Sequence, residues 1–193
     1  MFRLLWLTVL VMPLGGCVAP PQAFGVYTHD TRQLVRLDYD YDRDGRIDVR
    51  TYIRDGKAFR LEGDTNADGR VDRWEYYGAS GELLRIGASA EDDGREDTWI
   101  RVVGDERHVD ISTRRDGLID RREVYREDVL LRAEWDTNHD GLTDRWEEFT
   151  AGVVTGVLVD EYRMLGRPTR RISYSPSGEA RVERIEEAAD AGR

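Results

Sequence analysis

The sequence contains a single cysteine, Cys17, among its 193 residues. Disulfides within one chain are therefore excluded as a source of stability. Histidine is also scarce, and His29, His108 and His139 lie too far apart to show the spacing of zinc ligands. None of them has an obvious cysteine or serine partner for nucleophilic catalysis.

Basic residues are outnumbered by acidic ones. The chain has 29 Lys and Arg against 39 Asp and Glu, so its formal net charge is −10 and its pI is about 4.9. An acidic surface repels phosphate and attracts cations, which excludes a nucleic acid partner. Aromatic residues make up 9% of the chain, enough for the core of one domain or of a short run of repeats.

The N-terminal apolar run is too short to span a membrane. It extends from Leu4 to Leu14, whereas a spanning helix needs ~20 residues. Arg3 precedes it and Leu14-Gly15-Gly16-Cys17 follows it, which is the order of segments in a signal peptide. An ordinary cleaved signal peptide with an unrelated cysteine is the alternative.

Leu14-Gly15-Gly16-Cys17 resembles the lipobox of bacterial lipoprotein signal peptides. The resemblance implies that residues 1–16 are removed, and that Cys17 becomes the first mature residue and carries a lipid. That lipid would attach the exported protein to a membrane. Val18 follows the cysteine in place of the Asp associated with inner-membrane retention, so the resemblance implies the outer membrane, on either its periplasmic or its surface face.

Five loops of the Asp-Gly type form an internal repeat. They occupy residues 40–48, 64–72, 89–97, 112–120 and 136–144, so the unit recurs every 23 to 25 residues. Every loop has Asp at its fifth position, Gly at its sixth and Asp at its ninth; the fifth-position residues are Asp44, Asp68, Asp93, Asp116 and Asp140. This agreement across five units is not an accident of composition.

The residues around each loop predict β-strands. Before the first loop, Leu37 and Tyr39 alternate with Arg36 and Asp38, the period of two that a strand with one apolar face requires. After the loops, second strands with apolar groups on both faces are predicted over residues 46–53, 70–77, 95–102, 118–125 and 142–149. Turn signals such as Asp55-Gly56 then reverse the chain.

The predicted fold is therefore all-β, an antiparallel meander of about five to six strand–Asp loop–strand units over residues 27–186. Residues 17–26 are predicted to be the lipid anchor and an extended tether, since Pro20 and Pro21 lie there. The region after Asp160 is interpreted as a degenerate sixth unit that no Asp loop precedes. Residues 187–193 are predicted to be a C-terminal tail.

Three loops carry a full set of oxygen ligands for a hard cation. Calcium takes six to eight oxygens, and side chains at positions one, three, five and nine would supply four of them, with the position-seven carbonyl as a fifth. The predicted ligands are Asp40, Asp42, Asp44, Arg46 and Asp48 in the first loop, Asp64, Asn66, Asp68, Arg70 and Asp72 in the second, and Asp136, Asn138, Asp140, Leu142 and Asp144 in the fifth. About three Ca²⁺ sites are therefore predicted. The alternative is turn chemistry alone, which explains the glycine and one Asp but not four converging side chains.

The other two loops depart from this pattern. Ser89, Glu91, Asp93 and Asp97 in the third loop are predicted to hold at most a weakly bound ion. In the fourth loop Arg114 occupies position three, where its guanidinium would compete with a metal. An internal salt bridge is expected there, and the site is interpreted as lost.

The loops resemble two families of calcium sites. Residues 64–75 and 136–147 match the EF-hand loop, including Glu75 and Glu147 at position twelve, but the first loop has Thr51 there and all flanks alternate as strands. The closer resemblance is to the DxDxDGxxD loops between β-strands in integrin-type propellers, which use the ninth-position Asp. This resemblance implies calcium at the three complete loops.

The expected function is a calcium-stabilised, surface-attached repeat scaffold without catalysis of its own. One alternative is an adhesion module that binds an envelope or extracellular protein through Trp74, Trp99 and Trp146; another is a helical EF-hand sensor. An enzyme is the least favoured class, because the clustered carboxylates all belong to loops and no phosphate-binding loop is present. A pair of sugar-cleaving carboxylates is the form of catalysis that so acidic a sequence leaves open.

Overall fold

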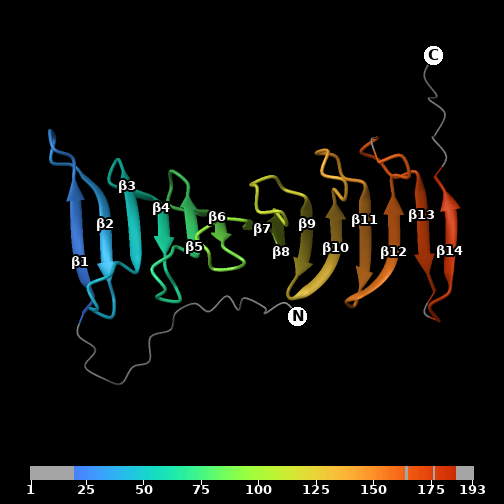
Figure 1. Cartoon of the computed structure of the whole chain (residues 1–193), viewed down its shortest axis with the longest axis horizontal. Coiled ribbons are helices and arrows are strands. Elements are labelled where there is room, and N and C mark those ends of the chain that lie inside the picture. Colours follow the sequence, from blue (N-terminus) through green and yellow to red (C-terminus); the bar gives the residue numbers. More distant parts are fainter. Residues whose placement is uncertain (1–19, 164, 176, 186–193) are drawn as a thin grey trace, which may run out of the picture.

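The computed structural model describes residues 20–163, 165–175 and 177–185, and its regular structure there consists of strands only. The strands are β1 (Gln22–Tyr27), β2 (Leu34–Asp40), β3 (Val49–Arg54), β4 (Lys57–Gly63), β5 (Arg73–Tyr77), β6 (Leu83–Ala88), β7 (Thr98–Val103), β8 (Glu106–Ile111), β9 (Arg121–Arg126), β10 (Val129–Trp135), β11 (Arg145–Thr150), β12 (Val153–Val159), β13 (Arg170–Tyr174) and β14 (Ala180–Arg184). They form one 14-stranded sheet in which each strand pairs with its sequence neighbours (Figure 1). The predicted all-β meander is confirmed.

Two kinds of connection alternate along the chain. Tight turns such as Asp55-Gly56, where both residues have positive φ angles of 51° and 74°, join the strands at one edge of the sheet. The Asp loops join them at the opposite edge. Because the sheet twists, as β-sheets do, these loops lie along its lower margin in the left half of Figure 1 and along its upper margin in the right half.

The second strand of each unit begins later than the sequence predicts. β3 starts at Val49 instead of residue 46, because the loop continues through its ninth position. There the N–H of Asp48 donates to the carbonyl of Tyr39 at 2.9 Å, and Asp144 does the same to Trp135 at 2.8 Å. The strand can start only after this hydrogen bond has closed the loop.

The sheet also begins earlier than predicted. Residues 22–26, assigned to the tether by their nearness to two prolines, form most of β1 and pair with β2, with Phe24 opposite Asp38. The prediction of a tether was therefore wrong for these residues. The predicted signal peptide, Cys17 and the predicted tail at residues 187–193 lie outside the described residues. Among those described, no helix is long and apolar enough to cross a membrane.

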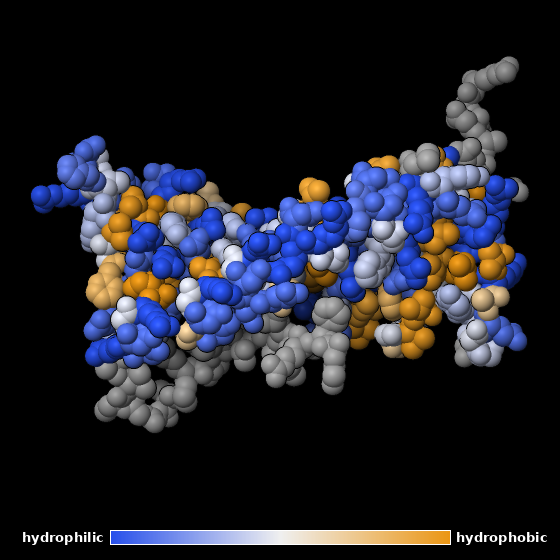
Figure 2. All heavy atoms as spheres, in the orientation of Figure 1, coloured by the Kyte–Doolittle hydropathy of each residue, from blue (hydrophilic) through white to orange (hydrophobic). Residues whose placement is uncertain are grey.

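The core consists of rows of side chains that cross a single-layered sheet. One row runs through directly paired residues on one face: Gly25, Leu37, Thr51, Leu61, Glu75, Ile86, Ile100, Val109, Glu123, Ala133, Glu147, Val157, Ile172 and Val182. Ala133 is only 1% exposed. Figure 2 shows hydrophilic residues across the middle of the visible face and hydrophobic residues gathered toward the two ends of the sheet.

Trp74 belongs to the opposite face. It is 5% exposed and lies between its paired residues Glu62 and Gly87. The interpretation of this tryptophan as a packing residue is confirmed. Trp99 and Trp146 occupy the equivalent position and are half-buried, so the three do not form the exposed aromatic patch that an adhesion module would need.

Three glutamates interrupt the core row, and each pairs with an arginine two residues earlier on the same face. The pairs are Arg73–Glu75, Arg121–Glu123 and Arg145–Glu147. Tyrosines also donate hydrogen bonds to two of them, Tyr77 to Glu75 and Tyr125 to Glu123. Burial, together with the hydrogen bond to a carboxylate, raises the pKa of both Tyr77 and Tyr125 to about 12.

Alkaline pH is expected to destabilise the sheet through these two tyrosines. Their pKa is higher in the folded chain than the ~10 of an unfolded one, so their contribution is complete below pH 10 and is lost as pH rises to about 12. Each would add a slope of at most about 1.4 kcal/mol per pH unit to the decline. Urea unfolding between pH 9 and 12 measures this. A Y77F/Y125F double variant should show a flatter decline, and an equally steep one would contradict the assignment.

Candidate metal sites

The first residue of each loop holds the loop closed. In four of the five loops its side chain accepts a hydrogen bond from the N–H of the sixth-position glycine: Gly45 to Asp40 at 3.0 Å, Gly69 to Asp64 at 2.7 Å, Gly117 to Ser112 at 3.2 Å and Gly141 to Asp136 at 2.8 Å. In the third loop Ser89 accepts the N–H of Asp93 at 3.1 Å instead. These glycines have φ angles of 85° to 91°, which favour glycine over any other residue. The pattern of position one and position six in the sequence therefore specifies the loop frame.

The ninth-position Asp ties the end of the loop to its start. In the first loop Asp48 accepts the N–H of Tyr41 at 2.6 Å. In the fifth, Asp144 accepts both the N–H of Thr137 at 3.2 Å and its hydroxyl at 2.8 Å. A carboxylate has about four lone-pair sites, so these bonds leave capacity for a cation.

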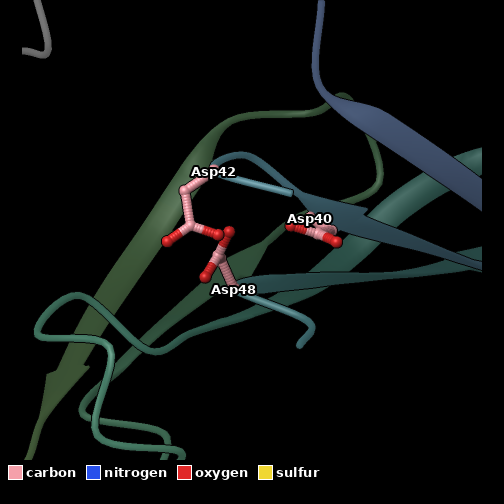
Figure 3. Close-up of side chains that lie close together, drawn as sticks. All are labelled: Asp40, Asp42 and Asp48. Atoms are coloured by element: carbon pink, nitrogen blue, oxygen red, sulfur yellow. The ribbon is translucent and has the colours of Figure 1, made fainter. Parts of the chain in front are cut away.

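Three carboxylates come together in the first loop (Figure 3). Asp40 at the end of β2, Asp42 in the loop and Asp48 just before β3 each offer an oxygen, and these oxygens all lie within 4.8 Å of one another. Asp40 is buried, with 2% of its surface exposed, whereas Asp42 is exposed. In the part of the chain that the structure describes, no ion pair reaches any of the three. Their mutual repulsion is what a cation bound among them would relieve.

Asp44, also a predicted ligand, lies apart from this group. One of its oxygens accepts the N–H of Arg46 at 2.7 Å, and the other lies 3.8 Å from the Nε atom of the same arginine. The local ion pair gives Asp44 a partner that the sequence pattern does not reveal. The carbonyl of Arg46 stays a predicted ligand.

The second and fifth loops keep the same frame with an amide at position three. Asn66 and Asn138 accept the N–H of the fifth-position Asp at 3.0 and 3.1 Å through their side-chain oxygens. In neither loop do three acidic side chains approach as closely as in the first. The ligand sets at residues 64–72 and 136–144 therefore stay predictions. In both loops the first carboxylate accepts the N–H of the sixth-position glycine, and the ninth accepts the N–H of the second residue, as in the first loop.

Arginines of the fourth loop form ion pairs with the acidic side chains of the third and fourth loops. Arg114 lies 3.7 Å from Asp116, the internal salt bridge expected there. The neighbouring Arg115 was not singled out by the sequence, yet it forms ion pairs with Glu91, Asp93 and Asp97 of the third loop. Only the spatial contact of the two loops reveals this interaction.

A sixth loop precedes the last repeat unit, contrary to the prediction that no Asp loop is present there. It starts at Asp160, whose carboxylate accepts N–H groups from Tyr162, Leu165 and Gly166 at 2.7 to 3.1 Å. Burial alone would raise the pKa of Asp160, but these backbone donors outweigh it and lower the pKa. Thr169 closes the loop, accepting the N–H of Glu161 at 3.0 Å where the other loops use Asp.

Comparisons with known proteins give no further guide to the site. No protein-family model and no curated protein sequence matches the chain.

Proposed function

We propose that this protein is a calcium-binding structural repeat protein of the cell envelope, in which the metal stabilises the loop edge of the sheet. The observation that carries the proposal is the convergence of Asp40, Asp42 and Asp48 with no counter-charge among the described residues. Calcium fits this group because it accepts carboxylate and carbonyl oxygens in flexible geometry. The second and fifth loops are proposed as the other two sites on the basis of their shared frame.

The expected stabilisation is comparable to the stability of a domain. Extracellular calcium modules bind with dissociation constants of roughly 10⁻⁴ to 10⁻³ M. At a free calcium concentration about ten times the dissociation constant, each site contributes about 1.4 kcal/mol. Three sites would give about 4 kcal/mol, close to the lower end of the 5–15 kcal/mol typical of folded proteins. A chain without disulfides would thus fold more stably outside the cell than in a low-calcium cytosol.

The attachment to a membrane is proposed from Cys17 and the lipobox-like motif before it. A lipid on this residue would place the sheet at the surface of a membrane, proposed to be the outer membrane, with β1 starting at Gln22 close to the anchor. The role assigned to the sheet is structural, and a protein partner in the envelope or outside the cell is left unidentified.

Calcium is expected to raise the melting temperature of the chelator-treated chain, and Asp42→Ala is expected to reduce that rise, measured for each variant against its own melting temperature in EDTA. Alanine is chosen because asparagine already holds this position in the second and fifth loops, which are themselves proposed sites. Asp42 is exposed and accepts a single backbone N–H, that of Asp44, so alanine removes the ligand and leaves the bonds of Asp40 to the loop in place. Asp55→Asn, in a turn at the opposite edge, is the matched control and should behave as the unmodified chain. Differential scanning calorimetry in EDTA and in 5 mM calcium, on the order of ten times the expected dissociation constant, makes the comparison.

Two results would count against the proposal. If the unmodified chain had the same melting temperature in EDTA and in calcium, the loops would be turns that bind no metal. A full calcium response in Asp42→Ala would remove the first loop from the set of sites.

A further inference from the structure

Consecutive loops contact one another along the edge of the sheet. The first residue of each loop donates its N–H to the carbonyl of the ninth residue of the loop before it, as from Asp64 to Asp48 at 2.8 Å and from Ser112 to Asp97 at 2.8 Å. The loops therefore form a continuous stack, and a side chain of one loop can reach the ligand positions of its neighbour.

Position four is the point from which this reach occurs. In all five loops the residue there has a positive φ angle, between 55° and 66°: Arg43, Ala67, Asp92, Arg115 and His139. Arg115 reaches back from the fourth loop to the third, and His139 Nδ1 of the fifth loop lies 3.5 Å from Asp120 of the fourth. In both pairs of loops, position four contacts the ninth-position Asp of the preceding loop.

Arg115 contacts the three acidic groups that occupy the metal-ligand positions of the third loop. Its Nη1 atom lies 2.8 Å from Glu91 at position three, its Nε atom 3.2 Å from the buried Asp97 at position nine, and its Nη2 atom contacts Asp93 at position five. The arginine side chain is itself only 21% exposed. A guanidinium carries a fixed positive charge and five donors, so it can contact all three carboxylates at once and offset part of their negative charge without a metal.

The first loop provides the contrast. The loop that follows it has Ala67 at position four, a side chain with no charge and no hydrogen-bonding atom. Asp40, Asp42 and Asp48 accordingly keep their close approach without an ion pair in the described part of the chain. The two loops thus differ in the residue that their successor places over them.

We propose that Arg115 is the built-in cation of the third loop, and that a loop takes a metal unless a cationic side chain at position four of the following loop reaches its acidic group. The second half of this statement rests on the proposed function, because it assumes that the first loop binds calcium. The ion pairs of Arg115 would then stabilise the third loop, in the middle of the sheet, whether or not calcium is present. Arg163 holds position four of the sixth loop, but among the described residues it forms no ion pair with the carboxylates of the fifth.

The test counts the calcium ions bound per full chain by equilibrium dialysis, in parallel with melting temperatures in EDTA. Arg115→Gln removes the charge but keeps hydrogen-bonding groups, and it should bind one more calcium ion than the unmodified chain and melt at a lower temperature in EDTA. Arg115→Lys keeps the charge and should gain no ion. Arg114→Gln is the matched control, since it removes the neighbouring arginine. It should bind no more calcium ions than the unmodified chain.

The converse variant is Ala67→Arg. Ala67 is exposed, so an arginine fits there. It should form ion pairs with the carboxylates of the first loop, and the chain should then bind one calcium ion fewer. This variant keeps the proposal testable if Arg115→Gln does not fold.

The outcomes separate this inference from the proposed function. If the unmodified chain binds no calcium, the proposed function fails, and the difference between Arg115→Gln and the unmodified chain still decides the role of Arg115. If Arg115→Gln folds, gains no ion and melts as the unmodified chain does in EDTA, Arg115 is not the cation of the third loop. If Ala67→Arg keeps every ion, position four does not control the site.

Discussion

Replacing Asp40 by alanine is expected to lower the free energy of unfolding by about 3 kcal/mol in calcium-free solution, since each hydrogen bond to a charged group contributes about 1.5–3 kcal/mol. The carboxylate of Asp40 accepts the N–H of Arg43 at 2.6 Å and that of Gly45 at 3.0 Å, and it is almost fully buried. Alanine would leave both donors without this acceptor. Urea unfolding in EDTA measures the change.

Two controls separate the loop frame from the metal. Asp40→Asn keeps an acceptor oxygen and should lose less stability than Asp40→Ala. Asp42→Ala removes an exposed side chain that accepts a single backbone N–H, and it should cost less than 1 kcal/mol in EDTA, as one ordinary hydrogen bond would. If Asp40→Ala were as stable as the unmodified chain, the first position would not hold the loop.

Replacing Glu123 by alanine is expected to cost about 3 kcal/mol as well, the lower end of the cost of breaking a buried ion pair. Glu123 is 6% exposed in the middle of the core row and accepts hydrogen bonds from Arg121 and Tyr125. Without it, the largely buried Arg121 would keep its charge and lose its partner. Urea unfolding at neutral pH is again the measurement.

The matched control is Glu183→Ala in the edge strand β14. Glu183 pairs with Arg181 at 2.7 Å, but the side chains of both residues are exposed. A pair of this kind contributes about 0–1 kcal/mol, so the control should cost less than 1 kcal/mol. Equal losses for the two variants would show that the buried glutamates are not part of the core.

Much of the fold is predictable because both of its elements are encoded locally. The alternation of Leu37 and Tyr39 with charged residues specifies a strand, and a glycine at a position of positive φ specifies the loop. The start of β3 depends instead on the hydrogen bond from Asp48 to Tyr39, which forms across the loop. The inclusion of Gln22–Tyr27 depends on pairing with β2, which two nearby prolines obscure.

The candidate site is predictable to a smaller extent for the same reason. The spacing of Asp40, Asp42 and Asp48 follows from the loop itself, and the structure brings them together. The contact of Arg115 with Glu91 joins residues 24 positions apart and follows only from the stacking of loops. The sixth loop escapes the pattern because Thr169 replaces the ninth-position Asp and the loop is one residue longer.

Calorimetric titration of calcium into the chelator-treated full chain tests the central claim most directly. The proposal predicts saturable binding of about three ions with dissociation constants of roughly 10⁻⁴ to 10⁻³ M. It also predicts that Asp42→Ala binds one ion fewer. No binding heat at millimolar calcium, together with an unchanged melting temperature, would contradict the assignment of a metal to these loops.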